Sequence, residues 1–234
     1  VNQASLTITA SNQTKPYGTT LTLGAGQTTF TSSGLLNSDS VTSVTLASTG
    51  AAGAAAVGNY PIVPSTAVGS GLTNYNIGYS NGTLTVSSVG YVVTWPTPTS
   101  VVYGTPLSSL PHNAPSGVPG TAVYNPTNGA VLNAGTNMLT LVYTPTDTNY
   151  AATNFSVQLV VTPAPLSVTA SNVARLYGQP NPVFGGTISG IQNSDNITAT
   201  CASSATTNSG VGAYPIVPTL VDPNSRLVNY VVTT

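Results

Sequence analysis

The chain repeats itself over a distance of about 155 residues, and this repeat constrains the fold more than any other feature. The octapeptide VGNYPIVP at 57–64 returns as VGAYPIVP at 211–218. Four more pairs keep the same order at nearly the same spacing: SLTITASN (5–12) with PLSVTASN (165–172), KPYG (15–18) with RLYG (175–178), GLLNSD (34–39) with GIQNSD (190–195), and LTNY (72–75) with LVNY (227–230). Five landmarks in one order predict a duplicated domain.

The stretch between the two copies has the marks of a third, diverged unit. It carries VVYG at 101–104 and DTNY at 147–150, where the outer units carry their Tyr-Gly and Asn-Tyr pairs. We therefore predict three tandem domains: a first module (1–87), a middle module (88–163) and a third module (164–234). The linkers SSVG and PAP are very short, so we expect the modules to stack end to end as a rod.

The pattern of side chains predicts an all-β fold. Segments such as SLTIT (5–9), VTSVTL (41–46), NMLTLVYT (137–144) and FSVQLVV (155–161) alternate or cluster β-branched and aromatic residues, as half-buried strands do. Turn residues separate them, and SNGT at 80–83 predicts a hairpin. The Ala-rich segment 49–58 reads as a loop because it is interrupted by glycines.

Charge is almost absent. Three Lys and Arg and four Asp and Glu residues make up 3% of 234 residues, whereas ordinary domains have about 25%. Nucleic acid is excluded as a partner because neutralising phosphates requires clustered cations. We also expect no membrane insertion, since no apolar run approaches the ~20 residues of a spanning helix.

The motifs YG, GL..NSD, G.Y.I and NY.I…NGTLTV in the outer units resemble the MBG domains of the Tyr-Gly-X type, which occur in tandem in large secreted and surface-anchored bacterial proteins. The middle module resembles the bacterial Ig-like repeats that alternate with them. The resemblance implies an Ig-like sandwich in the middle and a sandwich or a β-grasp-like sheet in each outer module. It also implies a structural or adhesive repeat, with no family catalytic residue to carry over.

The repeated tyrosines and glycines are interpreted as fold residues. A buried Tyr can anchor its hydroxyl on the backbone, and Gly supplies turn conformations that other residues avoid. This set consists of Tyr17, Gly18, Tyr60, Tyr103, Gly104, Tyr177, Gly178 and Tyr214. In the octapeptides, Val57 and Val211 recur together with Tyr60 and Tyr214, and we expect these four residues to belong to the cores of the outer modules.

The few charges sit at matching places in the two outer modules. Lys15 and Arg175 each lie two residues before Tyr-Gly, and Asp39 and Asp195 each end an NSD segment. The sequence predicts the ion pairs Lys15–Asp39 and Arg175–Asp195. The alternative is that each Asp caps its own turn.

No combination of residues predicts catalysis, a metal site or a cofactor. His112 lacks the neighbouring ligands or the base that such chemistry requires, and Glu is absent. Cys201 lies at or beside the place of Thr45–Leu46 and is expected to be a small buried hydrophobe. Sequons at Asn12, Asn81, Asn154 and Asn196 are candidate glycosylation sites.

The third module reaches NYVVTT at 229–234 without a segment like NGTLTV. Either the chain is a fragment of a longer array, or a neighbouring chain supplies that strand. We expect a non-enzymatic structural segment of an extracellular, cell-surface bacterial protein, in an adhesin stalk or a fibre. Its partners would be neighbouring repeats or copies of itself. The alternatives are a filament subunit completed by strand addition, and a carbohydrate-binding module that uses Trp95 or tyrosines to contact surface glycans.

Overall fold

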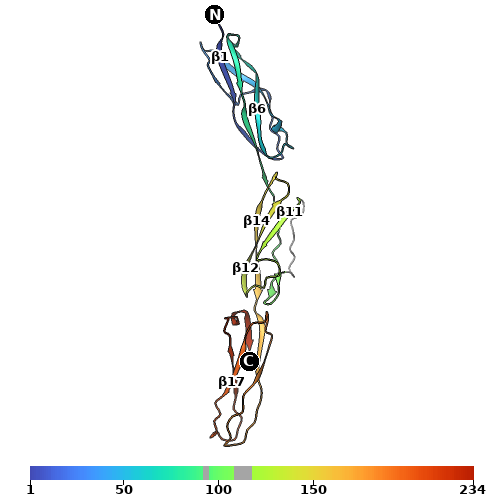
Figure 1. Ribbon diagram of the computed structural model, residues 1–234, viewed down its shortest axis with the longest axis vertical. Helices are drawn as coiled ribbons and strands as arrows, with labels where there is room; N and C mark the ends of the chain where they lie inside the picture. Colours follow the sequence, from blue (N-terminus) through green and yellow to red (C-terminus); the bar gives the residue numbers. More distant parts are fainter. Residues whose placement is uncertain (92–94, 108–117) are drawn as a thin grey trace. The chain divides into compact units, whose positions relative to one another are not determined.

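The computed structural model describes residues 1–91, 95–107 and 118–234. The described chain is all-β, as the sequence predicts, and its only helices are the short 3-10 turns η1 (Thr49–Ala51), η2 (Leu72–Asn74) and η4 (Leu227–Asn229) (Figure 1). Among these residues, no helix has the length and apolar character that crossing a membrane would require.

The first module forms two sheets. Its strands are β1 (Ala4–Ala10), β2 (Gln13–Pro16), β3 (Gly24–Gln27), β4 (Phe30–Ser33), β5 (Ser40–Ala47), β6 (Gly58–Ser70), β7 (Tyr75–Ser80) and β8 (Gly82–Ser87). One sheet has the order β4-β1-β7 and the other the order β2-β8-β6-β5-β3. β1 runs parallel to β7, and β8 runs parallel to β2 and antiparallel to β6.

Both sheets of the first module contribute to one core. Leu6 and Ile8 enter it from β1, and Leu46, Ile62 and Leu84 enter it from β5, β6 and β8. Strand alternation places these side chains on the inner faces. Two sheets around a shared core make a sandwich, and no α-helix of the kind a β-grasp fold requires lies among the described residues.

The expected hairpin at 80–83 is wrong. β7 and β8 follow each other closely, yet they belong to different sheets and do not pair. The chain crosses from one layer of the sandwich to the other at Asn81 because Ile77 and Leu84 pack against the same core from opposite layers.

The middle module has the described strands β9 (Val89–Gly90), β10 (Val101–Val102), β11 (Gly120–Asn125), β12 (Gly135–Pro145), β13 (Tyr150–Ala151) and β14 (Thr153–Thr162). Four of them form a sheet in the order β10-β14-β12-β11, and β9 pairs with β13 in parallel. The segment YVVTW (91–95), whose pattern also predicts a strand, lies partly outside the described residues, and His112 lies wholly outside them. The Ig-like architecture of this module stays a prediction.

The third module repeats part of the first. Its strands are β15 (Ala164–Ala170), β16 (Gly186–Ser189), β17 (Thr198–Ser203), β18 (Ile216–Val221) and β19 (Tyr230–Thr233). The sheet β16-β15-β19 matches β4-β1-β7 in order and direction, and the pair β17-β18 matches β5-β6. The register also agrees, because Ala4 lies opposite Tyr75 and Ala164 lies opposite Tyr230.

The chain divides into two compact units that cut through the middle module. One unit holds the first module with residues 143–153, and the other holds residues 122–142 with residues 154–234. In the second unit, one core contains Leu159 and Val161 of the middle module together with Leu166 and Ile197 of the third.

Candidate functional site

The NSD turn of the first module is closed by the tyrosine of its Asn-Tyr pair. The hydroxyl of buried Tyr75 donates to Asp39 Oδ2 at 3.0 Å and accepts a bond from the Leu36 backbone N–H at 2.7 Å. Asn37 and Ser38 take positive φ angles of 53° and 65° in this turn. Burial, and then the bond to the Asp39 carboxylate, raise the pKa of Tyr75 above its ordinary value.

The same turn in the third module also binds the middle module. Tyr230 donates to Asp195 Oδ2 at 2.7 Å, and Tyr103 of the middle module donates to the same oxygen at 3.0 Å. The guanidinium of Arg226 lies 3.9 Å from the other oxygen of this carboxylate. Burial, followed by the hydrogen bond to Asp195, raises the pKa of Tyr230 to about 12.

The two predicted ion pairs are therefore wrong. Asp39 bonds with Tyr75 and Asp195 bonds with two tyrosines and Arg226, whereas Lys15 and Arg175 bond elsewhere. The alternative, in which each Asp caps its own turn, does not account for the tyrosine hydroxyl that donates to each carboxylate. An Asp-Tyr bond spans more than 30 residues, so only the folded sandwich brings the two side chains together.

Lys15 and Arg175 instead bond with the carbonyl oxygens of neighbouring loops. Lys15 is 5% exposed, and its Nζ donates to the carbonyls of Thr19 and Ala52, each at 2.8 Å. Arg175 donates to the carbonyl of Gln179 at 3.0 Å and to that of Thr206. Each base therefore donates to the carbonyl of the residue four positions later in the chain. Each also donates to a carbonyl in the distant loop that precedes the octapeptide of its module.

The glycines of the Tyr-Gly pairs all take positive φ angles: 85° at Gly18, 98° at Gly104 and 79° at Gly178. Gly is favoured at such positions because it has no Cβ to clash with the backbone. The tyrosines before them differ in exposure, since Tyr103 is 4% exposed and Tyr177 is 68% exposed.

Tyr60 and Tyr214 anchor the loops before the two octapeptides. Each donates its hydroxyl to the carbonyl four residues earlier, at 2.9 Å from Tyr60 to Ala56 and 3.1 Å from Tyr214 to Gly210. Val57 and Val211, expected as core residues, are 38% and 98% exposed. That expectation is wrong because the strand begins only after them.

The junction between the first and middle modules uses the Tyr-Gly pair of one and the Asn-Tyr pair of the next. The rings of Tyr17 and Tyr150 meet edge to face, with centroids 5.9 Å apart. Asn149 Oδ1 accepts a 2.8 Å bond from the backbone N–H of Val57, immediately before the glycine that starts β6.

The junction between the middle and third modules follows the same rule. The rings of Tyr103 and Tyr230 meet edge to face at 5.4 Å. Asn229 Oδ1 accepts a 2.8 Å bond from the N–H of Ala134, immediately before the glycine that starts β12. Asn229 is 1% exposed. Sequence reasoning noticed these Asn-Tyr pairs only as period markers and missed that they hold one module to the next.

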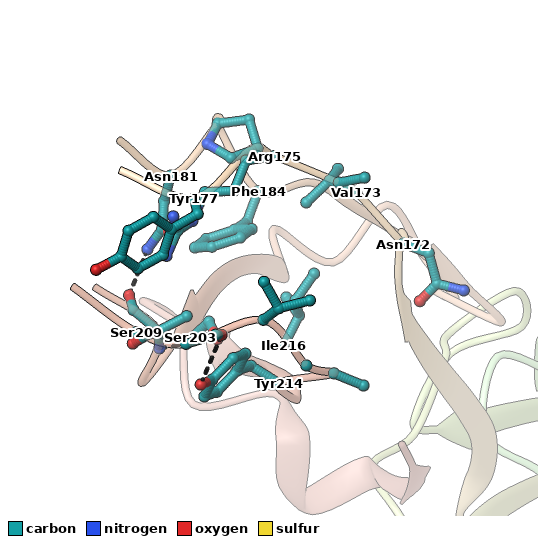
Figure 2. Close-up of a pocket in the computed structure, with 17 residues that line it drawn as sticks. Asn172, Val173, Arg175, Tyr177, Asn181, Phe184, Ser203, Ser209, Tyr214 and Ile216 are labelled. Atoms are coloured by element: carbon teal, nitrogen blue, oxygen red, sulfur yellow. Dashed lines mark hydrogen bonds between the residues drawn. The ribbon is translucent and has the colours of Figure 1, made fainter. Parts of the chain in front are cut away.

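A groove of about 340 Å³ lies in the third module (Figure 2). Val173, Arg175 and Tyr177 lie along one wall, and Tyr214 and Ile216 lie along the other. The ring of Phe184 also lines the groove.

No group of three or more His, Cys, Asp or Glu side chains that could hold a metal ion occurs in the described part of the chain.

Cys201 lies opposite Pro218 as Leu46 lies opposite Pro64, but it is only half-buried. Trp95 packs against the core of the second compact unit, and its ring meets the ring of Tyr124 edge to face. The four sequon asparagines are exposed, and their glycosylation stays a prediction.

The two outer modules are β-sandwiches with the same strand register. Each contacts the middle module through a tyrosine ring pair of the same kind, so the chain is a tandem-repeat protein. The model of the family described as MBG domain (YGX type) matches residues 6–85 and 166–234, which is more than half of the chain. The chain belongs to this family. A comparison with curated proteins found no match. MBG domains are repeat-type modules of bacterial surface proteins, and the family is a structural one.

Proposed function

We propose that this chain is a spacer segment of an extracellular bacterial surface protein, as in an adhesin stalk, in which each module fixes its neighbour. The observation that supports this function is the repeated junction: Tyr-Gly of one module against Asn-Tyr of the next, with the Asn side chain bonded to a backbone N–H. Such contacts resist bending between modules. The segment's work is then reach and stiffness, and no enzymatic role is proposed.

Some counterparts of the junction residues are exposed in the outer modules, and these exposed residues support the docking of further modules. Tyr177 and Val211 occupy in the third module the places of Tyr17 and Val57, and they are 68% and 98% exposed. Asn74, the counterpart of Asn149 and Asn229, is exposed in the first module. Neighbouring repeats, in the same protein or in another copy, are the partners that match these two ends.

Residual dipolar couplings in solution test the stiffness. In the intact chain, we expect the couplings of the first and third modules to fit one alignment tensor. Replacing Asn149 with Ala together with Tyr17→Ala removes the first junction, so the first module should then need its own, smaller tensor. Asn74→Ala is the matched control and should leave the single tensor unchanged. Independent tensors in the intact chain would overturn the spacer function.

Display on the cell is tested separately. Antibodies raised against the segment should label intact cells of the producing bacterium, and protease added outside should remove the label. Labelling only after lysis would contradict the surface location.

Glycan binding is the second candidate, favoured by the exposed aromatic rings of Tyr177 and Tyr214 beside the amide of Asn181 in the groove. Flat aromatic faces and amides are groups on which sugars dock. Saturable binding on a glycan array that Tyr177→Ala and Tyr214→Ala abolish would establish it, and an array without signal would remove it. A fibre built by strand addition would use the same modules with a strand shared between chains.

A further inference from the structure

In the first module, the segment by which the chain enters and the segment by which it leaves run side by side in the same direction. β1 pairs with β7 in parallel, and β2, which follows β1, pairs in parallel with β8, which follows β7. Ala4 lies opposite Tyr75 and Gln13 lies opposite Leu84, so each residue faces the one 71 positions later in both ladders. Together they form one parallel ladder, here called the terminal ladder, which keeps a single register while it passes from one sheet to the other.

The place where the terminal ladder crosses between the sheets is also bonded. Oδ1 of Asn12 accepts a 2.8 Å bond from the backbone N–H of Thr83, which is again 71 positions later. Gly82 lets the two segments come close, since a Cβ there would lie 2.5 Å from a backbone carbonyl oxygen of the other segment. At the far end of the ladder, the N–H of Tyr17 donates to the carbonyl of Ser87 at 2.8 Å. The two segments are therefore in contact along their whole length.

Each segment of the terminal ladder is held on its other side as well. β1 pairs with β4 and β8 pairs with β6, in both cases antiparallel. Alternate side chains of the ladder lie in the core, where Ile8 and Leu84 are 0% exposed and Val86 is 1% exposed. To peel away sideways, either segment would have to break a second ladder and expose apolar surface to water, which costs free energy.

The direction of the two segments decides how the module responds to tension. The chain enters the first module at the start of β1 and leaves it at the end of β8, at opposite ends of the module (Figure 1). Because both segments run the same way, tension at these two points pulls them past each other along their length. Such shear loads all the bonds of a ladder at once, whereas pulling on the facing ends of an antiparallel pair opens its bonds one after another.

We propose that the terminal ladder is a mechanical clamp, and that bearing tension along the chain is a further function of the first module. The biological role of the clamp rests on the proposed spacer function, because a spacer between a cell and its contact carries the force that pulls on that contact. The other modules pair in the same direction where they are described, β10 with β14 and β15 with β19.

Single-molecule force spectroscopy with two pulling directions tests the clamp. Handles are attached through introduced cysteines in the intact chain, with Cys201→Ser so that the native thiol does not react. Asn2→Cys with Ser88→Cys pulls the terminal ladder in shear, whereas Ser40→Cys with Ser70→Cys pulls apart the facing ends of β5 and β6. The unfolding force should be at least about twofold higher in the shear direction, because forced unfolding is governed by the barrier and all bonds of the ladder must break together there.

Both pairs of handles lie at exposed or half-buried positions, so the urea transition of the first module should be the same in the two variants. The folded state being pulled is then the same, and a difference in force reports the direction of pulling. An equal or lower force in the shear direction would overturn the clamp.

One bond at the crossing provides a second test. Asn12→Ala removes the bond with Thr83 inside the terminal ladder. Thr42→Val is the matched control, because it removes a 3.0 Å bond from the Thr42 hydroxyl to the carbonyl of Val68 outside the ladder. Both changes should lower the stability of the first module to urea, but only Asn12→Ala should lower the unfolding force in the shear direction. Equal losses of force in the two variants, or no loss in Asn12→Ala, would contradict the proposal.

Failure of the clamp and failure of the spacer function are distinguishable. The forces are measured within the first module, whereas the dipolar couplings compare the first module with the third. Equal forces in both directions together with a single alignment tensor would remove the clamp and leave the spacer. A higher force in shear together with independent tensors would support the clamp and remove the spacer.

Discussion

At the residue scale, the carboxylate of Asp195 has partners from two modules. Tyr230 and Tyr103 donate to one of its oxygens, and Arg226 lies near the other. Removing one donor from a charged acceptor weakens the fold because the remaining groups stay buried without it. The equivalent carboxylate in the first module, Asp39, has a single tyrosine donor.

Tyr103→Phe should lower the free energy of unfolding of the third module by about 1–3 kcal/mol, since one bond to a charged acceptor is lost while the ring remains. Urea denaturation followed by NMR signals of that module measures this change. Tyr177→Phe, at a side chain that is 68% exposed, is the matched control and should have no effect. An equal effect of both changes would refute the role of the bond.

The pKa of Tyr230 predicts how stability depends on pH. Its folded pKa of about 12 lies above the ordinary tyrosine value of about 10, so the unfolded chain loses this proton first. The contribution of Tyr230 is therefore fully present below pH ~10 and is lost as the pH rises towards 12. Tyr230→Phe should flatten the fall in the free energy of unfolding across this range, measured by denaturation at several pH values. An unchanged slope would contradict the assignment.

Lys15 provides a second test at this scale. Lys15→Met keeps the length of the side chain but leaves the carbonyls of Thr19 and Ala52 without their donor. We expect a loss of about 1–3 kcal/mol in the stability of the first module. Lys15→Arg, which introduces the base found at the equivalent position of the third module, should retain most of it. A thermal or urea transition of the first module distinguishes the two variants.

At the element scale, the two outer modules show how much of the fold a sequence pattern predicts. Alternation predicts β1, β5, β12 and β14 because the period of a strand is visible locally. It could not predict that β7 and β8 lie in different sheets, since strand pairing depends on which core each strand meets. It also could not show that β6, which contains YPIVP, lies between β5 and β8 in the interior of a sheet.

The turn that precedes each NSD segment depends on a glycine. Gly34 and Gly190 have φ angles of 107° and 96°, and a Cβ at either position would overlap a backbone carbonyl, that of Ser5 or of Pro165. Gly190→Ala should therefore destabilise the third module by about 2 kcal/mol or more, because both the backbone conformation and the close approach are disturbed. Gly185→Ala, whose Cβ would meet nothing within 4 Å, is the control. Differential scanning calorimetry would show the effect, and equal melting temperatures would contradict it.

At the scale of the whole molecule, the compact units of the structure differ from the repeated modules of the sequence. The core of the second compact unit contains Leu159 and Val161 from the middle module and Leu166 and Ile197 from the third. The core of the first module contains none of these residues. Sequence boundaries near 87 and 163 mark the repeats, but they do not show where buried surface is shared.

This shared core predicts coupled unfolding. Leu166→Ala should cost about 2–5 kcal/mol and should lower the hydrogen-exchange protection of β14 in the middle module as well as that of β15. The matched change Leu84→Ala should reduce protection only in the first module. If protection in β14 stays at its original level in Leu166→Ala, the modules unfold independently.

The sequence by itself determined the all-β class, the duplication and the family, because alternation and period are carried by order along the chain. The matching places of Lys15 with Arg175 and of Asp39 with Asp195 were also readable. The partners of these four side chains could not be read from the sequence. A charged side chain in so uncharged a chain suggests an opposite charge, but the fold offers Lys15 carbonyl oxygens and Asp39 a tyrosine hydroxyl at closer range. Only the tertiary structure decides such choices, because distances across a sandwich depend on which strands pair and not on their separation in sequence.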